Sequence, residues 1–278
     1  MSGSRRFTLP VFPVLPFLVV ALGILALTAS HSEADSAKIW AGHAKEFEEL
    51  LENAEVVSIK ELGSGANNPK RLMLRQGERT LRGLWKPIQR GPKDWAWESY
   101  ETEVAAYEID RMLGLNMVPP TVVKEIDGQK GSLQLWVDGC RLFEDVEGDD
   151  HETASWERQM SRMRVFDTVI GNWDRGPRNY MVDDDWNIVL IDHSQAFSSS
   201  HYLEEQFDKM PPRFDRDQIE SMKHWDVEYL SFRFGQLLLT PQVDAIIIRR
   251  DALLRYVDDL VDNRGDENVW FADETDKE

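Results

Sequence analysis

Cysteine is nearly absent from this sequence, because Cys140 is the only one in 278 residues. No disulfide bond can form within the chain, so none can staple the fold. Positive charge is also scarce: 32 lysines and arginines stand against 50 aspartates and glutamates, for a formal net charge of −18. That deficit argues against a nucleic-acid-binding protein, which needs clustered cations, and disfavours docking on anionic lipid.

The remaining composition is that of an ordinary globular protein, with 42% apolar and 29% charged residues. At ~150 residues per domain, the length predicts one large or two small domains with enough chain to bury a real core. These values exclude collagen, a coiled-coil array and wholesale disorder.

A long hydrophobic run occurs near the N-terminus, where Arg5 and Arg6 precede the apolar stretch Phe7–Ala29. Cations followed by an apolar run are typical of an export signal, and spanning a membrane takes ~20 such residues. We therefore interpret residues 1–34 as a signal peptide or signal anchor. The rest of the chain is expected outside the cytoplasm (secreted, lumenal or periplasmic), with membrane contact only through this segment.

The first half of the remaining chain predicts a small sheet. Residues 35–54 have helical spacing and predict a lead-in helix. Residues 55–139 predict a mostly antiparallel sheet with one inserted amphipathic helix over 96–115. The predicted strands lie at 56–62, 71–74, 80–85, 121–125 and 132–137.

The second half predicts a helix-rich region over residues 140–262, which makes the fold class α+β. A hairpin is expected over 179–192, with Asp183–Asp185 as its solvated tip. Residues 263–278 are interpreted as an acidic tail. The predicted helices of this region lie at 153–170, 240–248 and about 251–261.

Three polar residues carry the strongest chemical signal. A predicted helix runs into Asp174, a strand starts at Asn179, and a second strand ends at Asp192, thirteen residues later. These side chains can therefore converge at one end of a hairpin. Phosphoryl transfer needs such a set: a carboxylate to accept the hydroxyl proton, and a carboxylate and an amide to hold Mg²⁺. An ordinary hairpin is the alternative, because Asp and Asn are common turn residues.

The segment Gly171–Tyr180, with the later Ile-Asp at 191–192, resembles the catalytic segments of two kinase groups. These are the phosphatidylinositol-kinase-like enzymes and, more closely, the secretory-pathway kinases that include the Golgi casein kinase and the Four-jointed proteins. The resemblance extends over about 56–197 and implies a two-lobed protein-kinase-like fold, with an N-lobe over 55–139 and a C-lobe over 140–262. Its other segments are Leu62–Gly65, Leu84–Pro87, Glu103–Tyr107 and Leu115–Pro120.

The resemblance implies a nucleotide site in the N-lobe. Lys86 corresponds to the strand lysine that contacts the nucleotide phosphates, and Glu103 to its helical ion-pair partner. Gly63 and Gly65 would let the backbone approach the phosphates, although a plain hairpin turn explains them equally well. Two rivals for the glutamate role lie on the same predicted helix, Glu98 and Glu101.

It also implies the catalytic roles in the C-lobe. Asp174 would be the catalytic base, Asn179 and Asp192 the metal ligands, and Asp167 a residue that supports the loop or caps the helix. One departure is Gly176, which stands where the related segments usually carry histidine.

The expected function is an atypical kinase that uses ATP, or another nucleoside triphosphate, with Mg²⁺ or Mn²⁺. Its acceptor would be a hydroxyl of a protein, a glycan or a small molecule. The departure at Gly176 keeps one alternative open, a catalytically inactive pseudokinase that binds a nucleotide or a partner. A further alternative is an enzyme with the same fold that transfers a nucleotidyl group.

Overall fold

The computed structural model describes residues 37–63, 68–93, 96–147, 153–200, 207 and 209–272. The predicted signal or anchor segment therefore lies outside the described residues. The described chain belongs to one compact unit, Ser36–Glu278. No helix of this described part is long and apolar enough to cross a membrane.

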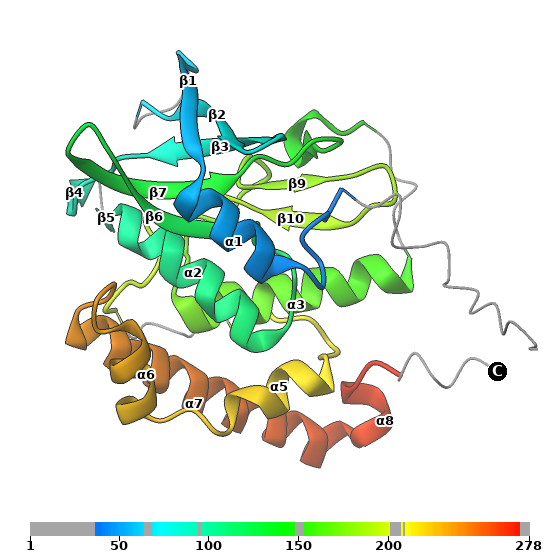
Figure 1. Ribbon diagram of the computed structural model, residues 1–278. Helices are drawn as coiled ribbons and strands as arrows, with labels where there is room; N and C mark the ends of the chain where they lie inside the picture. The colour runs from blue at the N-terminus through cyan, green and yellow to red at the C-terminus, as the bar shows by residue number, and fades with distance from the viewer. Residues whose placement is uncertain are drawn as a thin grey trace, which may run out of the picture. The chain divides into compact units, whose positions relative to one another are not determined.

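The predicted α+β class is confirmed: an antiparallel sheet is combined with helices in one chain (Figure 1). The strands are β1 (Glu55–Glu61), β2 (Lys70–Gln76), β3 (Arg79–Lys86), β4 (Gly91–Lys93), β5 (Ala96–Glu98), β6 (Thr121–Ile126), β7 (Gln129–Leu135), β8 (Arg141–Leu142), β9 (Tyr180–Val182) and β10 (Ile188–Leu190). The helices are α1 (Ala44–Asn53), α2 (Tyr100–Leu113), the 3-10 turn η1 (Phe143–Asp145), α3 (Ala154–Ile170), α5 (Arg216–Met222), α6 (Val227–Phe234), α7 (Thr240–Arg264) and α8 (Asp266–Val269).

The main sheet has the strand order β1-β2-β3-β7-β6, and each neighbouring pair is antiparallel. Helices α1 and α2 both pack against its β6–β7 side. A smaller sheet, β10-β9-β8, lies beside α3. Lys86 is the last residue of β3 and lies opposite Ser132 of β7. Its side chain reaches Glu103 of α2 and Asp192, which follows β10.

Two hydrophobic clusters fill the unit. The first lies between α1 and the main sheet and includes Trp40, Leu51 and Trp85, all at most 2% exposed. The second surrounds α3 and α7 and includes the inner faces of α2, α5 and α6. Because α2 sends its apolar side into the second cluster, it connects the sheet to the helical half of the molecule.

Helix α2 begins later than the predicted helix over 96–115. Residues Ala96–Glu98 pair with Gly91–Lys93 as the hairpin β4–β5 instead. The helix starts after Ser99, whose extended backbone and side-chain hydroxyl cap it by accepting the N–H of Thr102. Gly114, at φ 63°, ends it.

The predicted break between two C-terminal helices is wrong, because α7 is one continuous helix of 25 residues. Arg249 and Arg250, at the predicted break, are good helix formers, and both are buried. Helices α5 and α6 were not predicted. Each begins at an aspartate that accepts a backbone N–H, Asp215 and Asp226, which is a signal that the sequence does contain.

The predicted acidic tail, residues 263–278, begins as folded structure, although most of its first ten residues are exposed. Helix α7 continues to Arg264, and α8 follows it. Val269 is fully buried, and its carbonyl accepts the N–H of Phe214 at 2.7 Å. Burial of the apolar side chains of this stretch stabilises its conformation, while its charged side chains remain in water. Residues 273–278 lie outside the described residues.

The tip of the β9–β10 hairpin is also only partly solvated. Asp184 is exposed, as predicted, but Asp183 is 4% exposed. The carboxylate of Asp183 accepts the backbone N–H groups of Asp185, Asn187 and Ala37. It therefore ties the hairpin turn to the chain that precedes α1.

Asp110 of α2 is a second buried carboxylate, and its Oδ1 accepts the N–H groups of Met117 and Val118 at 3.0 and 3.1 Å. Burial raises its pKa from 3.8 to about 7, and these hydrogen bonds and the nearby Lys38 only partly offset that effect. The folded state therefore holds the proton of Asp110 more tightly than the unfolded state. Its contribution to stability is present below pH 4 and is lost as the pH rises to about 7.

The variant Asp110→Asn tests this linkage, because asparagine keeps an acceptor oxygen but does not titrate. We expect the melting temperature of the variant, relative to the wild type, to be higher at pH 8 than at pH 5. Asp127→Asn, in the exposed β6–β7 turn, is the control and should show the same difference at both pH values. An unchanged difference for Asp110→Asn would contradict the prediction.

Candidate functional site

Three of the predicted site residues meet at a single ammonium group. Nζ of Lys86 lies 2.6 Å from Oε1 of Glu103 and 2.9 Å from Oδ1 of Asp192. The lysine and glutamate side chains are 12% and 2% exposed, whereas Asp192 is 46% exposed. A strand, a helix and the segment after β10 thus place a paired lysine beside an accessible carboxylate.

The pair is electrostatically coupled. Burial opposes the charge on Lys86, but the carboxylates of Asp192 and Glu103 outweigh it and raise the lysine pKa. Burial likewise opposes the charge on Glu103, but Lys86 and a hydrogen bond from His193 lower its pKa. Both groups are therefore charged at neutral pH.

Of the three candidate glutamates, Glu103 is the one that reaches Lys86. Glu101 lies 3.9 Å from Arg90, and Glu98 lies 3.9 Å from Lys93. The second oxygen of Glu103 accepts the backbone N–H of His193 at 3.0 Å. The glutamate therefore holds both the lysine and the residue that follows Asp192.

The structure also joins Asp174 and Asn179. Nδ2 of Asn179 donates to the carbonyl of Asp174 at 2.6 Å and to its Oδ2 at 3.2 Å. Asp174 is exposed, and its loop begins where Gly171 ends α3. The amide oxygen of Asn179 is left to accept or to bind a cation.

Arg175 was given no role from the sequence. It links the pair of Asp174 and Asn179 to the segment that contains Asp192. Its side chain is 3% exposed and donates to both oxygens of Asp167, at 2.9 and 3.0 Å. It also donates to the carbonyls of Asn179 and Ile191, the latter at 2.9 Å, and lies 2.8 Å from Nε2 of His193. The Asp-Arg dipeptide was visible in the sequence, but the partners of the arginine come from distant segments.

His193 is unusual in its complete burial, and Asp192 in its backbone conformation. His193 is fully buried, and burial lowers its pKa despite the nearby Glu103 carboxylate, whose Oε2 lies 3.8 Å from Nδ1. Asp192 has φ 60°, in the left-handed region that non-glycine residues rarely adopt. Since Lys86 holds the side chain of Asp192, and Glu103 holds the next N–H, the surroundings maintain this conformation.

The glycine turn of the N-lobe is only partly described. Gly63 has φ 65°, which favours glycine, and Gly65 lies outside the described residues. The resemblance also implies that the backbone of residues 134–137 would face the adenine of a nucleotide. Two N–H groups of this segment are already used, because those of Leu135 and Trp136 donate to the carbonyls of Pro120 and Arg82.

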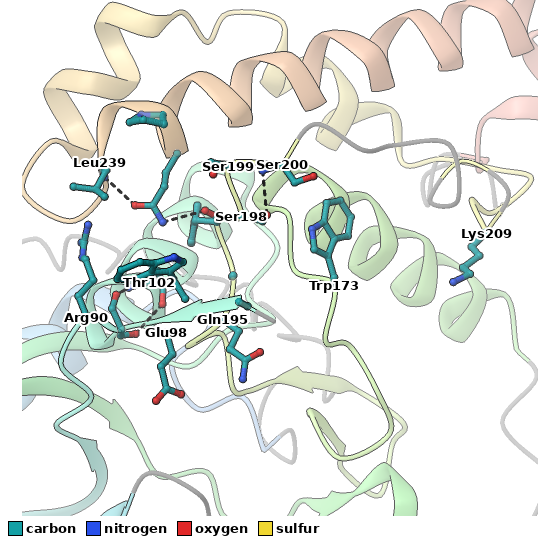
Figure 2. A pocket seen from close by; sticks show the side chains of 17 residues that line it. Arg90, Glu98, Thr102, Trp173, Gln195, Ser198, Ser199, Ser200, Lys209 and Leu239 are labelled. Atoms are coloured by element: carbon teal, nitrogen blue, oxygen red, sulfur yellow. Dashed lines mark hydrogen bonds between the residues drawn. The ribbon is translucent and has the colours of Figure 1, made fainter. Parts of the chain in front are cut away.

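A cavity of about 840 Å³ is lined by residues from the segments that carry the site, although none of Lys86, Glu103, Asp174, Asn179 and Asp192 lines it (Figure 2). Its walls come from β5, the start of α2, the segment after Asp192 and the start of α7. Trp173 and Gln195, which neighbour Asp174 and Asp192 in sequence, both line it. Its other lining residues are Arg90, Ala96, Trp97, Glu98, Ser99, Thr102, Ala196, Phe197, Ser198, Ser199, Ser200, Lys209, Leu239, Pro241 and Gln242.

Comparison with known proteins supports the fold. No family model matches the chain. Protein Rv2133c of Mycobacterium tuberculosis is 24% identical in an alignment of 178 residues, and the match covers 52% of this chain and 64% of that protein's length. The chain therefore covers less than two thirds of the length of this relative.

Two solved structures align over most of the chain. Hydra Fam20 with sugar aligns with a TM-score of 0.62 and 14% identity, over 83% of this chain and 93% of the other. The Golgi casein kinase with Mn/ADP bound gives 0.60 and 12%, over 82% and 78%. The chain therefore has the atypical kinase fold of the secretory-pathway kinases, and the predicted two-lobed kinase-like fold is confirmed.

The variant Glu103→Gln tests the ion pair. It leaves the buried ammonium of Lys86 with one carboxylate, so we expect the free energy of unfolding to fall by about 3 kcal/mol. Glu101→Gln is the matched control and should cost less than about 1 kcal/mol, because its partner Arg90 is 3.9 Å away. Equal losses in urea denaturation would contradict the assignment of Glu103.

Proposed function

We propose that this protein is an atypical kinase that transfers the γ-phosphate of a nucleoside triphosphate, ATP in the first instance, to a hydroxyl group. The observation that carries the proposal is the placement of Lys86, paired with Glu103, beside Asp192. A strand lysine oriented by a helical glutamate is the arrangement with which kinases hold nucleotide phosphates. The bound ADP of the Golgi casein kinase supports the same use of this fold.

The residues also fit a divalent cation. Asp192 and Asn179 offer carboxylate and amide oxygens, which hard cations prefer, and Asp192 stays partly exposed while it holds Lys86. Among the described residues, no three His, Cys, Asp or Glu side chains form a metal cluster by themselves. Mg²⁺ typically takes one or two carboxylates together with substrate phosphates. When bound, Mg²⁺ or Mn²⁺ would neutralise charge on the phosphate oxygens.

Asp174 would act as the base. The acceptor hydroxyl oxygen attacks the γ-phosphorus, and its proton passes to the Asp174 carboxylate. The bond between the γ-phosphorus and the bridging oxygen breaks, and ADP leaves with the electron pair. Asn179 holds Asp174 in place through its amide nitrogen.

The cavity is the proposed acceptor site, because Trp173 and Gln195 place it beside the segments of Asp174 and Asp192. Its volume and aromatic walls suit a compact polyhydroxylated acceptor, and hydra Fam20 was solved with sugar. A protein or other small-molecule acceptor gives different products in the same assay. The apolar N-terminal run supports an exported or membrane-anchored enzyme.

A pseudokinase is the second candidate, and Gly176 favours it. A Cβ built at Gly176 would meet no atom within 4 Å, so packing does not explain why the larger histidine is missing there. A pseudokinase would bind ATP but transfer no phosphate.

The test incubates the full-length chain with γ-labelled ATP, Mg²⁺ or Mn²⁺, and a panel of serine and threonine peptides, free sugars and glycerol. We expect transfer to at least one acceptor, and Asp174→Asn should lower its rate by ~10²–10⁴-fold, because the base is lost. Asp184→Asn, at the exposed hairpin tip, removes the same charge and should leave the rate unchanged.

Three outcomes would contradict the proposal. Stabilisation by ATP without transfer would identify a pseudokinase. An acceptor mass gain of AMP would identify nucleotidyl transfer. Transfer that survives Asp174→Asn would remove Asp174 from the role of base.

A further inference from the structure

The C-terminal end of α3 is held by groups far away in the sequence. The last carbonyls of a helix have no partner within it, so other donors must satisfy them. Here the N–H groups of Gly171 and Asn172 donate to the carbonyls of Thr168 and Asp167 in the local cap. The next two carbonyls accept donors from distant parts of the chain. The carbonyl of Val169 accepts a hydrogen bond from Nε of Arg249 at 3.0 Å, and that of Ile170 accepts the N–H of Phe197 at 2.7 Å.

Arg249 is a fully buried residue in the middle of α7. Besides Val169, its guanidinium donates through Nη1 to the carbonyls of Ser198 and Ser200, at 2.6 and 3.2 Å. All the acceptors that it has among the described residues are thus backbone carbonyls of two segments. The planar fork of arginine can reach both segments at once, which a lysine ammonium cannot match.

The second of these segments forms one wall of the cavity. Figure 2 shows Ser198, Ser199 and Ser200 between Leu239 and Trp173. Helix α7 holds this wall a second time, because Nε2 of Gln242 donates to the carbonyl of Phe197 at 3.0 Å. The first segment leads, within four residues of Ile170, to Trp173, which also lines the cavity, and to Asp174.

Gly171 leaves the space that this arrangement needs. A Cβ on Gly171 would lie 2.7 Å from Cζ of Arg249 and 2.9 Å from its Nη1. The glycine therefore serves the left-handed turn at φ 64° and also admits the guanidinium.

We infer that Arg249 is a positioning residue, which fixes the wall Phe197–Ser200 of the acceptor cavity relative to the loop that carries Asp174. The inference rests on the proposed function and adds to it a determinant of acceptor binding that touches neither nucleotide nor acceptor. Removing the guanidinium should release the wall, so that acceptor binding weakens while the nucleotide site, built around Lys86, is unchanged.

Arg249→Lys is the test variant, since it keeps the charge and loses the fork. We expect the KM for the acceptor that the wild type phosphorylates best in the panel to rise about tenfold, the equivalent of one lost charge-assisted hydrogen bond. The Kd for ADP with Mn²⁺ should stay within twofold. Hydrogen exchange should become faster in the peptide that contains residues 193–200.

Arg250→Lys is the matched control. Arg250 is the next residue of α7, is 6% exposed, and also donates to two backbone carbonyls, those of Met222 and Trp225. Its loss should destabilise the protein to a similar degree, with faster exchange near residues 222–225. The acceptor KM should stay within twofold of the wild-type value.

Equal acceptor KM values for the two variants, or unchanged exchange over 193–200 in Arg249→Lys, would overturn the inference. If Arg249→Lys does not fold, Arg249→Gln replaces it, because an amide cannot reach both segments at once and leaves no buried charge uncompensated. A wild type that phosphorylates no acceptor of the panel contradicts the proposed function instead. Exchange then still decides whether Arg249 holds the wall.

Discussion

The ion pair between Lys86 and Glu103 is the constraint on which the site depends. Both groups are nearly withdrawn from water, and a buried charge is costly unless an opposite charge compensates it. Strand β3 and helix α2 must therefore keep their relative position. Because the other oxygen of Glu103 holds the N–H of His193, the segment after β10 is bound to the same pair.

A second connection makes this arrangement rigid. At the start of α2, the N–H of Ser99 and the hydroxyl of Thr102 both donate to the carbonyl of Ser194. The helix thus holds the segment after Asp192 at two points, one beside the lysine and one at the cavity. A shift of α2 would alter the Lys86 pair and the cavity wall together.

Arg175 extends the network toward Asp174. Its pair with Asp167 is almost completely buried, and it also donates to the carbonyl of Asn179 and to that of Ile191, the residue before Asp192. The site therefore contains two fixed cations in a chain whose formal net charge is −18. Each of these cations is paired with a buried carboxylate, Glu103 or Asp167, so the two pairs fix the geometry of the site without giving it a net positive charge.

The main sheet, α3 and the β9–β10 hairpin could be predicted because each follows from local periodicity and turn residues. The pair of Lys86 with Glu103 also followed, but only through the resemblance, since no local pattern distinguishes Glu103 from Glu98 or Glu101. The contact of Lys86 with Asp192 was not predicted. The partners of Arg175 and Arg249 could not be predicted. Both arginines bind main-chain carbonyls, and a carbonyl leaves no mark in the sequence.

Binding through main-chain carbonyls separates the position of the cavity wall from the identity of its side chains. Arg249 and Gln242 hold residues 197–200 by carbonyl oxygens, which every amino acid supplies. The side chain of Ser199 can therefore be exchanged without removing these bonds, whereas the hydroxyl of Ser198 itself accepts the N–H of Ser200 at 3.1 Å. A wall built in this way can be adapted to a new ligand by substitution alone, while its distance from the reacting groups stays constant.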